Sequence, residues 1–195
     1  MKRSFFFSFF LTAIAALPAL AHTGVGEASS LSSGFGHPIG GLDHILAMVA
    51  VGILAAQQGG KAIYLIPASF IVMMIFGGVM GVSGVALPFV EIGIMGSVIV
   101  LGAVIALGRQ FTVPMSMALV GFLSIFHGHA HGTEMPLNAS GMEYGLGFIA
   151  ATALLHLAGL GLSLLIAKID NKITPLAIRA SGSAIAVLGV VLFVI

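Results

Sequence analysis

The sequence predicts an all-α integral membrane protein, a bundle of six transmembrane helices that follows an N-terminal signal peptide. Three observations predict this class. Apolar residues make up 59% of the chain and charged residues only 7%, whereas soluble domains contain about 25% charged residues. The apolar residues form runs of about 20, the length that crosses a bilayer. Beyond the N-terminal segment, the basic residues lie at or near every second connection between these runs, as expected for the cytoplasmic ends of membrane spans.

Residues 1–21 are predicted to be a signal peptide. Two basic residues precede an apolar core and an Ala-Leu-Ala ending, the pattern of a secretory signal cleaved after Ala21. An uncleaved anchor helix is the alternative. Residues 22–36, rich in Gly and Ser, would form a short periplasmic lead-in. Cleavage would make His22 the new N-terminus, a weak candidate metal ligand through its amine and imidazole.

Residues 37–195 are predicted to form one six-span transmembrane domain. The spans are expected at 37–57, 62–82, 86–107, 113–131, 142–167 and 175–195. The connections between them are short, and no soluble domain is inserted. Two glycine pairs, Gly77/Gly81 and Gly141/Gly145, have the spacing of close helix contacts in membranes.

The basic residues predict the orientation. If the N-terminus is outside the cytoplasm, all five basic residues beyond the signal peptide lie at cytoplasmic ends of spans. These residues are Lys61, Arg109, Lys168, Lys172 and Arg179. We therefore expect a multi-pass protein of the bacterial inner membrane with a periplasmic mature N-terminus. The basic residues are too scattered to form a nucleic-acid-binding face.

Most of the other ionisable side chains gather at the opposite, outer ends of the spans, and Asp170 is the one acid expected on the cytoplasmic side. The outer group includes His37, Asp43 and His44 in the first span, Glu91 in the third, and His127, His129, His131 and Glu134 in and after the fourth. His156 lies deeper, in the fifth span, where it is expected either to relay an ion or to hydrogen-bond a neighbouring helix. Ionisable groups within a membrane are costly and usually mark a site or a pathway.

The first span is expected to present one ligand face. In a continuous helix, His37 and His44 lie on the same side, Asp43 flanks that side, and Met48 follows one turn further on. Met48 is therefore the methionine that we consider a candidate ligand. Gly40 and Gly41 would let a neighbouring helix approach this face, plausibly the one that carries His127 and His131.

The fourth span is expected to present a second ligand face. His127, His131 and Glu134 follow at positions i, i+4 and i+7, whereas His129, a weaker candidate ligand, points to another side. With Glu91 at a similar depth, the two faces are expected to converge on one site.

The residue types favour a transition-metal cation. The sequence has no cysteine, which excludes thiolate metal sites, Fe–S clusters and disulfides. Imidazole suits Ni, Cu, Zn and Fe, whereas Ca²⁺ and Mg²⁺ prefer oxygen ligands. A zinc enzyme is an alternative, but His127-x-x-x-His131 lacks the adjacent Glu that acts as a base. A haem carrier is another, but its axial ligands, His44 and His156, would differ in depth.

Two motifs resemble the signatures of a known family. Residues 37–48, HPxxGxDHxxAM, are similar to the first-helix signature of the HupE/UreJ family of bacterial nickel/cobalt permeases. Residues 126–134, FHGxAHGxE, are similar to its second signature. The size, the signal-like N-terminus and the span count also match, so the resemblance covers nearly the whole chain.

The resemblance implies a secondary transporter, not an enzyme, that moves Ni²⁺ from the periplasm into the cytoplasm, with Co²⁺ as the alternative cargo. Nickel would supply hydrogenase or urease maturation, and cobalt would supply cobalamin synthesis. The metal would be the substrate and no prosthetic group is expected. The partners would be the lipid bilayer and a second copy or another membrane protein. The metal-site residues implied are His37, Asp43, His44, His127, His131 and Glu134, and more weakly Glu91 and Phe70.

Overall fold

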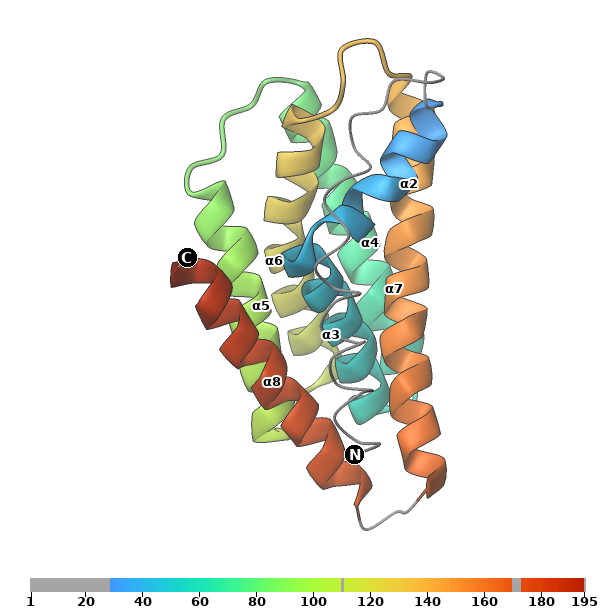
Figure 1. Ribbon diagram of the computed structural model, residues 1–195, viewed down its shortest axis with the longest axis vertical. Helices are drawn as coiled ribbons and strands as arrows, with labels where there is room; N and C mark the ends of the chain where they lie inside the picture. The colour runs from blue at the N-terminus through green and yellow to red at the C-terminus, as the bar shows by residue number, and fades with distance from the viewer. Residues whose placement is uncertain (1–28, 110, 170–172, 195) are drawn as a thin grey trace, which may run out of the picture.

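The computed structural model describes residues 29–109, 111–169 and 173–194 as a bundle of α-helices, with no strand in these ranges (Figure 1). The helices are α2 (Ser30–Gly40), α3 (Leu42–Gln58), α4 (Ala62–Val82), α5 (Val90–Leu107), α6 (Val113–Thr133), α7 (Gly141–Ile169) and α8 (Thr174–Val194). The all-helical membrane fold is therefore confirmed. The predicted signal peptide and His22 lie outside the described residues.

The first span differs from the prediction, because it is broken. Helices α4 to α8 are each long and apolar enough to cross a bilayer, and α2 with α3 would make a sixth span bent by 83°. The expected continuous helix over 37–57 is wrong: the chain is extended at Gly41, with φ −105° and ψ 126°. Part of the predicted lead-in is also helical, because α2 begins at Ser30. Similarly, α5 begins at Val90, four residues later than expected.

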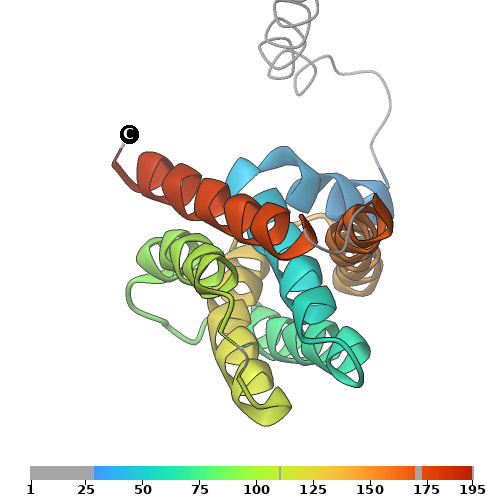
Figure 2. The same ribbon diagram turned by 90° about the horizontal axis from the view of Figure 1, so that it is seen from below.

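Helix α3 lies at the centre of the bundle. It packs against all six other described helices, and Met48, Val51 and Leu54 are fully buried. Around it, α8 packs on α5 and α7 packs beside α2 (Figure 2). Its 17 residues rise only about 25 Å at 1.5 Å per residue, which is less than the roughly 30 Å of a bilayer core. The N-terminal end of α3 therefore starts inside the protein rather than at a membrane surface.

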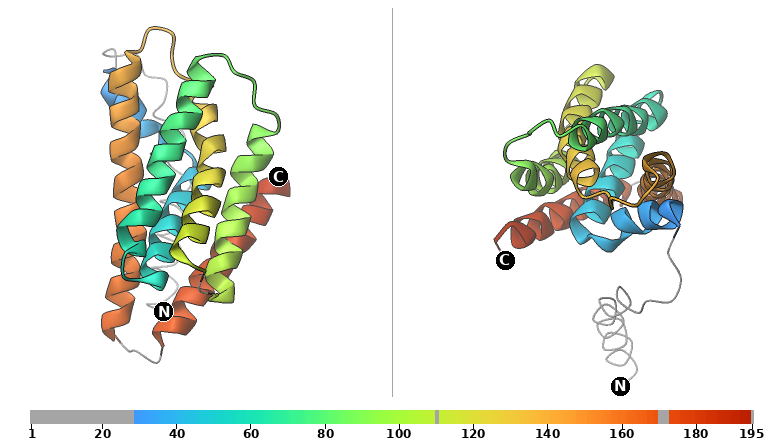
Figure 3. Two further views of the ribbon diagram at one scale, coloured as in Figure 1. Left: turned by 180° about the vertical axis from the view of Figure 1, so that it is seen from behind. Right: turned by 90° about the horizontal axis from the view of Figure 1, so that it is seen from above.

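Glycines allow α4 and α6 to touch along their backbones (Figure 3). A Cβ added at Gly77 would overlap the carbonyl oxygen of Ile125 on α6. A Cβ at Gly81 would overlap that of His129. Small residues are typical of helix pairs in lipid, where van der Waals contact rather than water exclusion drives association. The close-packing role predicted for Gly77 and Gly81 is confirmed.

The second predicted glycine pair behaves differently. No atom lies within 4 Å of a Cβ built at Gly145, and Gly141 meets only the side chain of Met135. The prediction that these two glycines bring helices together is therefore wrong. Close contact between α3 and α7 depends instead on Gly52 and Gly159, whose added Cβ atoms would strike the facing backbone.

The basic residues of the described part gather at one end of the bundle. Lys61 lies between α3 and α4, Arg109 follows α5, and Lys168 and Arg179 flank the α7–α8 connection at the foot of Figure 1. Lys172 lies outside the described residues. The connection between α6 and α7 is at the opposite end. The bundle thus has one basic end and one end without lysine or arginine among the residues described.

We predict that Gly77→Ala destabilises the protein by about 1–3 kcal/mol, because the added methyl group overpacks the α4–α6 contact. The matched control is Gly161→Ala, since open space surrounds a Cβ at that position of α7. Alanine at position 161 should leave the stability of the protein unchanged or raise it slightly, because alanine favours a helix more than glycine does. Thermal unfolding of the detergent-purified variants measures the difference, and equal melting temperatures would contradict this account of the contact.

Candidate metal site

The break between α2 and α3 creates the first part of the site. Asp43 and His44 lie in the first turn of α3, and the His44 Nδ1–H donates to Asp43 Oδ1 at 2.9 Å. A Cβ at Gly41 would lie 2.7 Å from Asp43 Oδ1 and 2.9 Å from His44 Nδ1. At position 41, only glycine leaves room for the hydrogen-bonded side chains of Asp43 and His44 beside the break. The expectation that Gly40 and Gly41 admit a neighbouring helix is wrong, because no atom of the described residues lies within 4 Å of a Cβ at Gly40, and the side chains of Asp43 and His44 fill the space at Gly41.

The bond to Asp43 determines which nitrogen of His44 is available. With Nδ1 donating its hydrogen, Nε2 carries the lone pair, and this atom is buried without a hydrogen-bond partner in the described structure. Metal-ligating histidines commonly donate their other ring N–H to a carboxylate, which fixes the tautomer and orients the ring. His44 is therefore prepared to bind a cation through Nε2.

Ser97 of α5 fixes the tautomer of His127 in the same way. The Ser97 hydroxyl donates to the carbonyl of Ile94 at 2.6 Å, so its oxygen accepts from His127 Nε2–H at 2.8 Å. The lone pair of His127 is therefore on Nδ1, which is buried and unpartnered in the described structure. The His127 and His44 ring centroids are 5.0 Å apart. Helices α3, α5 and α6 thus place two free imidazole nitrogens together.

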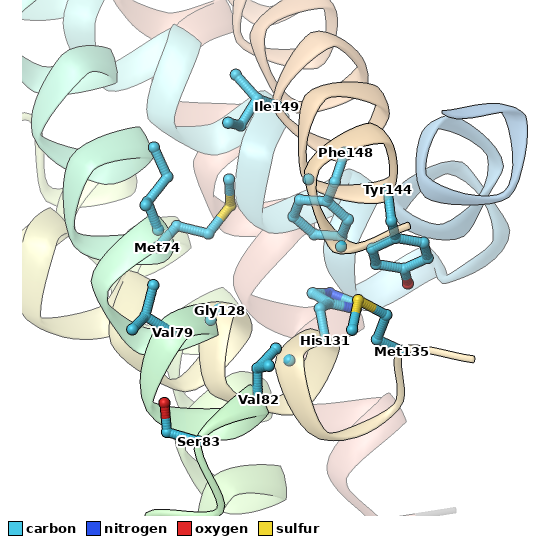
Figure 4. A pocket seen from close by; sticks show the side chains of 15 residues that line it. Met74, Val79, Val82, Ser83, Gly128, His131, Met135, Tyr144, Phe148 and Ile149 are labelled. Atoms are coloured by element: carbon cyan, nitrogen blue, oxygen red, sulfur yellow. The ribbon is translucent and has the colours of Figure 1, made fainter. Parts of the chain in front are cut away.

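His131 connects this buried pair to the outer end. Its ring centroid lies 4.5 Å from that of His44 and 4.6 Å from that of His37. Both its nitrogens are buried without a partner in the described structure. Figure 4 shows its ring among Met135, Tyr144 and Phe148, beside an apolar cavity of about 330 Å³ between α4, α6 and α7. An unpartnered buried polar group costs about 1–3 kcal/mol, so the imidazole of His131 is stabilised by a ligand that pairs with one of its nitrogens.

The outermost part of the site is a mixed nitrogen and oxygen group. His37, His131 and Glu134 each offer one ligand atom, and these atoms lie within 4.8 Å of one another. His37 Nε2 is 3.3 Å from Glu134 Oε2, and the two side chains are 37% and 54% exposed. This group is open at the end of the bundle away from the basic residues, whereas His44 and His127 lie deeper. The arrangement can take up a hydrated cation and pass it to buried ligands.

The structure brings most of the expected residues together, for a partly different reason. His37 and His44 both reach His131 because α2 folds across the bundle at Gly41, not because they share a helical face. His127, His131 and Glu134 follow one side of α6 and its C-cap, as expected. Met48 is fully buried in the core one turn beyond His44.

Two candidates lie apart from the cluster. His129 points elsewhere and donates from Nε2 to the carbonyl of Val85 at 2.7 Å, which ties α6 to the α4–α5 connection. Glu91 is exposed in the first turn of α5 and makes no hydrogen bond or ion pair with the described residues. Its expected convergence with the two ligand faces is not seen.

Sequence reasoning missed Ser97 and Tyr144. Ser97 is a polar residue in an otherwise apolar span, which was the available signal. Tyr144 lies with its ring centroid 6.1 Å from that of His37, and its buried hydroxyl has no partner in the described structure. No sequence motif marks Tyr144, which is the fourth residue of α7. The contact depends on the way α7 packs against α2.

We predict that Gly41→Ala weakens Ni²⁺ binding by about 10–100-fold, the usual effect of disturbing the partner of a metal ligand. The added methyl group would displace the Asp43–His44 pair. Gly40→Ala is the matched control, because no atom lies within 4 Å of a Cβ there. Equilibrium dialysis or calorimetry with purified protein measures the affinity, and equal affinities in the two variants would contradict the role of Gly41.

Comparisons with known proteins identify the family of this chain. The family model for the HupE / UreJ protein matches residues 10–192. Protein HupE of Rhizobium leguminosarum bv. viciae is 43% identical over 181 residues, which are 92% of this chain and 93% of that protein. No solved structure matches the chain. The matched region contains every residue of the metal cluster, and the chain belongs to the HupE/UreJ family of nickel/cobalt transporters.

Proposed function

We propose that this protein is a secondary transporter that moves Ni²⁺ from the periplasm into the cytoplasm. The observation that carries the proposal is the series of imidazoles at one end of the bundle, with free nitrogens on His44, His127 and His131. Family membership supports transport of nickel or cobalt. Neutral imidazoles with one carboxylate suit a divalent transition cation better than Ca²⁺ or Mg²⁺.

The charge distribution supports inward transport. Lys61, Arg109, Lys168 and Arg179 lie at one end of the bundle, and basic ends usually face the cytoplasm. The open group of His37, His131 and Glu134 then faces the periplasm. Inward movement of a cation is favoured by the membrane potential, by about 2.3 kcal/mol per charge for every 100 mV.

The ion would be passed inward by exchange of ligands. Glu134 and His37 meet the hydrated cation first, because their side chains are partly exposed. His131 touches the rings of both His37 and His44, so it can hold the ion while the outer ligands leave. His44 and His127 then take it through Nε2 and Nδ1 respectively. Asp43 stabilises the cation on His44 through the Nδ1 hydrogen bond.

Nickel imported in this way would serve hydrogenase or urease maturation. Cobalt for cobalamin synthesis is the alternative, because both cations accept the same nitrogen and oxygen ligands and are adjacent in the affinity series. Parallel titrations of the purified protein with Ni²⁺ and Co²⁺, followed by competitive uptake, distinguish the two cargoes.

We predict that His131→Ala reduces uptake of radioactive Ni²⁺ by cells by at least about tenfold, because it removes the ligand shared by the outer and inner parts of the site. Glu143→Gln is the control, since Glu143 is an exposed acid at the same end of the bundle that lies outside the cluster. Wild-type uptake by His131→Ala at an equal amount of membrane protein would refute the proposed function.

We also predict that outer and inner ligands affect uptake in different ways. His37→Ala should raise the KM for Ni²⁺ with little loss of maximal rate, because His37 captures the ion at the open end. His127→Ala should mainly lower the maximal rate, because it removes a ligand that holds the ion after capture. Concentration-dependent initial uptake rates separate these effects. The same kinetic change in both variants would argue against stepwise transfer.

A further inference from the structure

We propose that His156 of α7 is a second, inner binding station for the transported cation, separated from the outer cluster by the side chain of Phe70. This inference rests on the proposed transport function. It assigns a role to a buried histidine outside both sequence motifs, and it extends the path beyond His127 toward the basic end of the bundle.

The first observation is that His156 is buried and makes no hydrogen bond with the described residues. Its side chain is only 3% exposed, and neither ring nitrogen has a hydrogen-bond partner among the described residues. The sequence left open a hydrogen bond to a neighbouring helix, and none is present in the described structure. Leaving a buried polar group unpaired costs about 1–3 kcal/mol, so a purely structural role would favour an apolar residue here. A free neutral imidazole is an ideal nitrogen ligand for Ni²⁺ or Co²⁺.

The second observation is that His156 continues the series of imidazoles. The fully buried ring of Phe70 on α4 contacts the rings of both His127 and His156. Its centroid is 5.8 Å from that of His127 and 5.0 Å from that of His156. An aromatic face attracts a cation within about 6 Å of its centroid. Phe70 therefore separates the two stations without repelling an ion that passes between them.

The third observation is a cavity beyond His156, mostly apolar, whose lining includes the side-chain oxygen of Gln57, unpartnered among the described residues. Ser163 lies seven residues further along α7, on the same face of the helix and about 10 Å nearer the basic end. It lines a cavity of about 410 Å³ together with Gln57 of α3 and Arg179 of α8. The Gln57 side-chain oxygen is buried without a partner in the described structure. His156 thus lies between the outer cluster and a cavity that offers oxygen ligands near the cytoplasmic end.

Backbone packing holds His156 in this position. A Cβ at Gly52 of α3 would overlap the carbonyl oxygen of His156, and one at Gly159 would overlap that of Val49. The backbones of α3 and α7 are therefore in direct contact at this depth. A ligand on such a rigid contact is placed more reproducibly than one on a loop.

Uptake and binding measurements test the inference. We expect His156→Ala to lower the rate of Ni²⁺ uptake by at least about tenfold, the usual loss when a ligand position is disturbed. Ni²⁺ affinity of the outer cluster, measured on purified protein, should stay within about twofold of wild type. Uptake at the wild-type rate would overturn the proposal, and so would loss of outer binding, which would indicate a general structural role for His156.

A chemical-protection experiment tests metal binding at His156 directly. The chain has no cysteine, so His156→Cys provides a single thiol, which is itself a nickel ligand. We expect Ni²⁺ to slow modification of this thiol by methyl methanethiosulfonate, a small reagent that crosses membranes. Leu155→Cys, one residue earlier on α7 and partly buried, is the matched control and should react equally with and without Ni²⁺.

Equal modification rates for His156→Cys with and without Ni²⁺ would refute the inner station. This result can be distinguished from failure of the proposed function. If His131→Ala loses uptake but Ni²⁺ does not protect the thiol at position 156, the transport proposal is supported and the inner binding station is refuted. If His131→Ala keeps wild-type uptake, the transport proposal itself falls.

Discussion

The hydrogen bond between His44 and Asp43 is the interaction on which the rest of the site depends. It fixes the tautomer of His44 and leaves Nε2 free, and it requires the space that Gly41 provides at the break. The break turns α2 across the bundle, and this brings His37 to the His131 ring. One backbone irregularity therefore produces both the buried pair and the open group. Irregular backbone within a membrane protein is tolerated where it is buried in protein or lines a cavity.

The helix contacts are suited to holding these ligands in place. In lipid, helices gain little from burying apolar surface, so close backbone contact and shape complementarity stabilise the bundle. Gly77 and Gly81 provide such contact beside His129 and Ile125, on the same helix that carries His127 and His131. Helix α6 is consequently fixed against α4 along the turns that present the ligands. The free imidazole nitrogens are compatible with this fold because their positions are set by contacts elsewhere.

Much of the architecture could be predicted because its causes are local to each segment. Hydropathy and the positions of basic residues were sufficient for the helical membrane fold, and spacing along α6 was sufficient for the His127, His131 and Glu134 face. The break at Gly41 could not be predicted, because it depends on Asp43 and His44 filling the space beside it. Depth along the span groups Glu91 with the two ligand faces, but depth does not say which way a side chain points. Ser97 and Tyr144 enter the site through contacts between distant helices, which one sequence does not reveal.

The short central helix has a consequence for the energy barrier that an ion would meet. Because α3 begins inside the protein and rises only about 25 Å, water that reaches the partly exposed His37 and Glu134 would leave a dry layer thinner than the surrounding bilayer core. The transmembrane voltage would fall mainly across this thinner layer, so the electric field inside it would be stronger than in the lipid. The ion would also have to travel a shorter distance without its water shell. The broken first span thus concentrates the driving force on the stretch of protein that begins at His44.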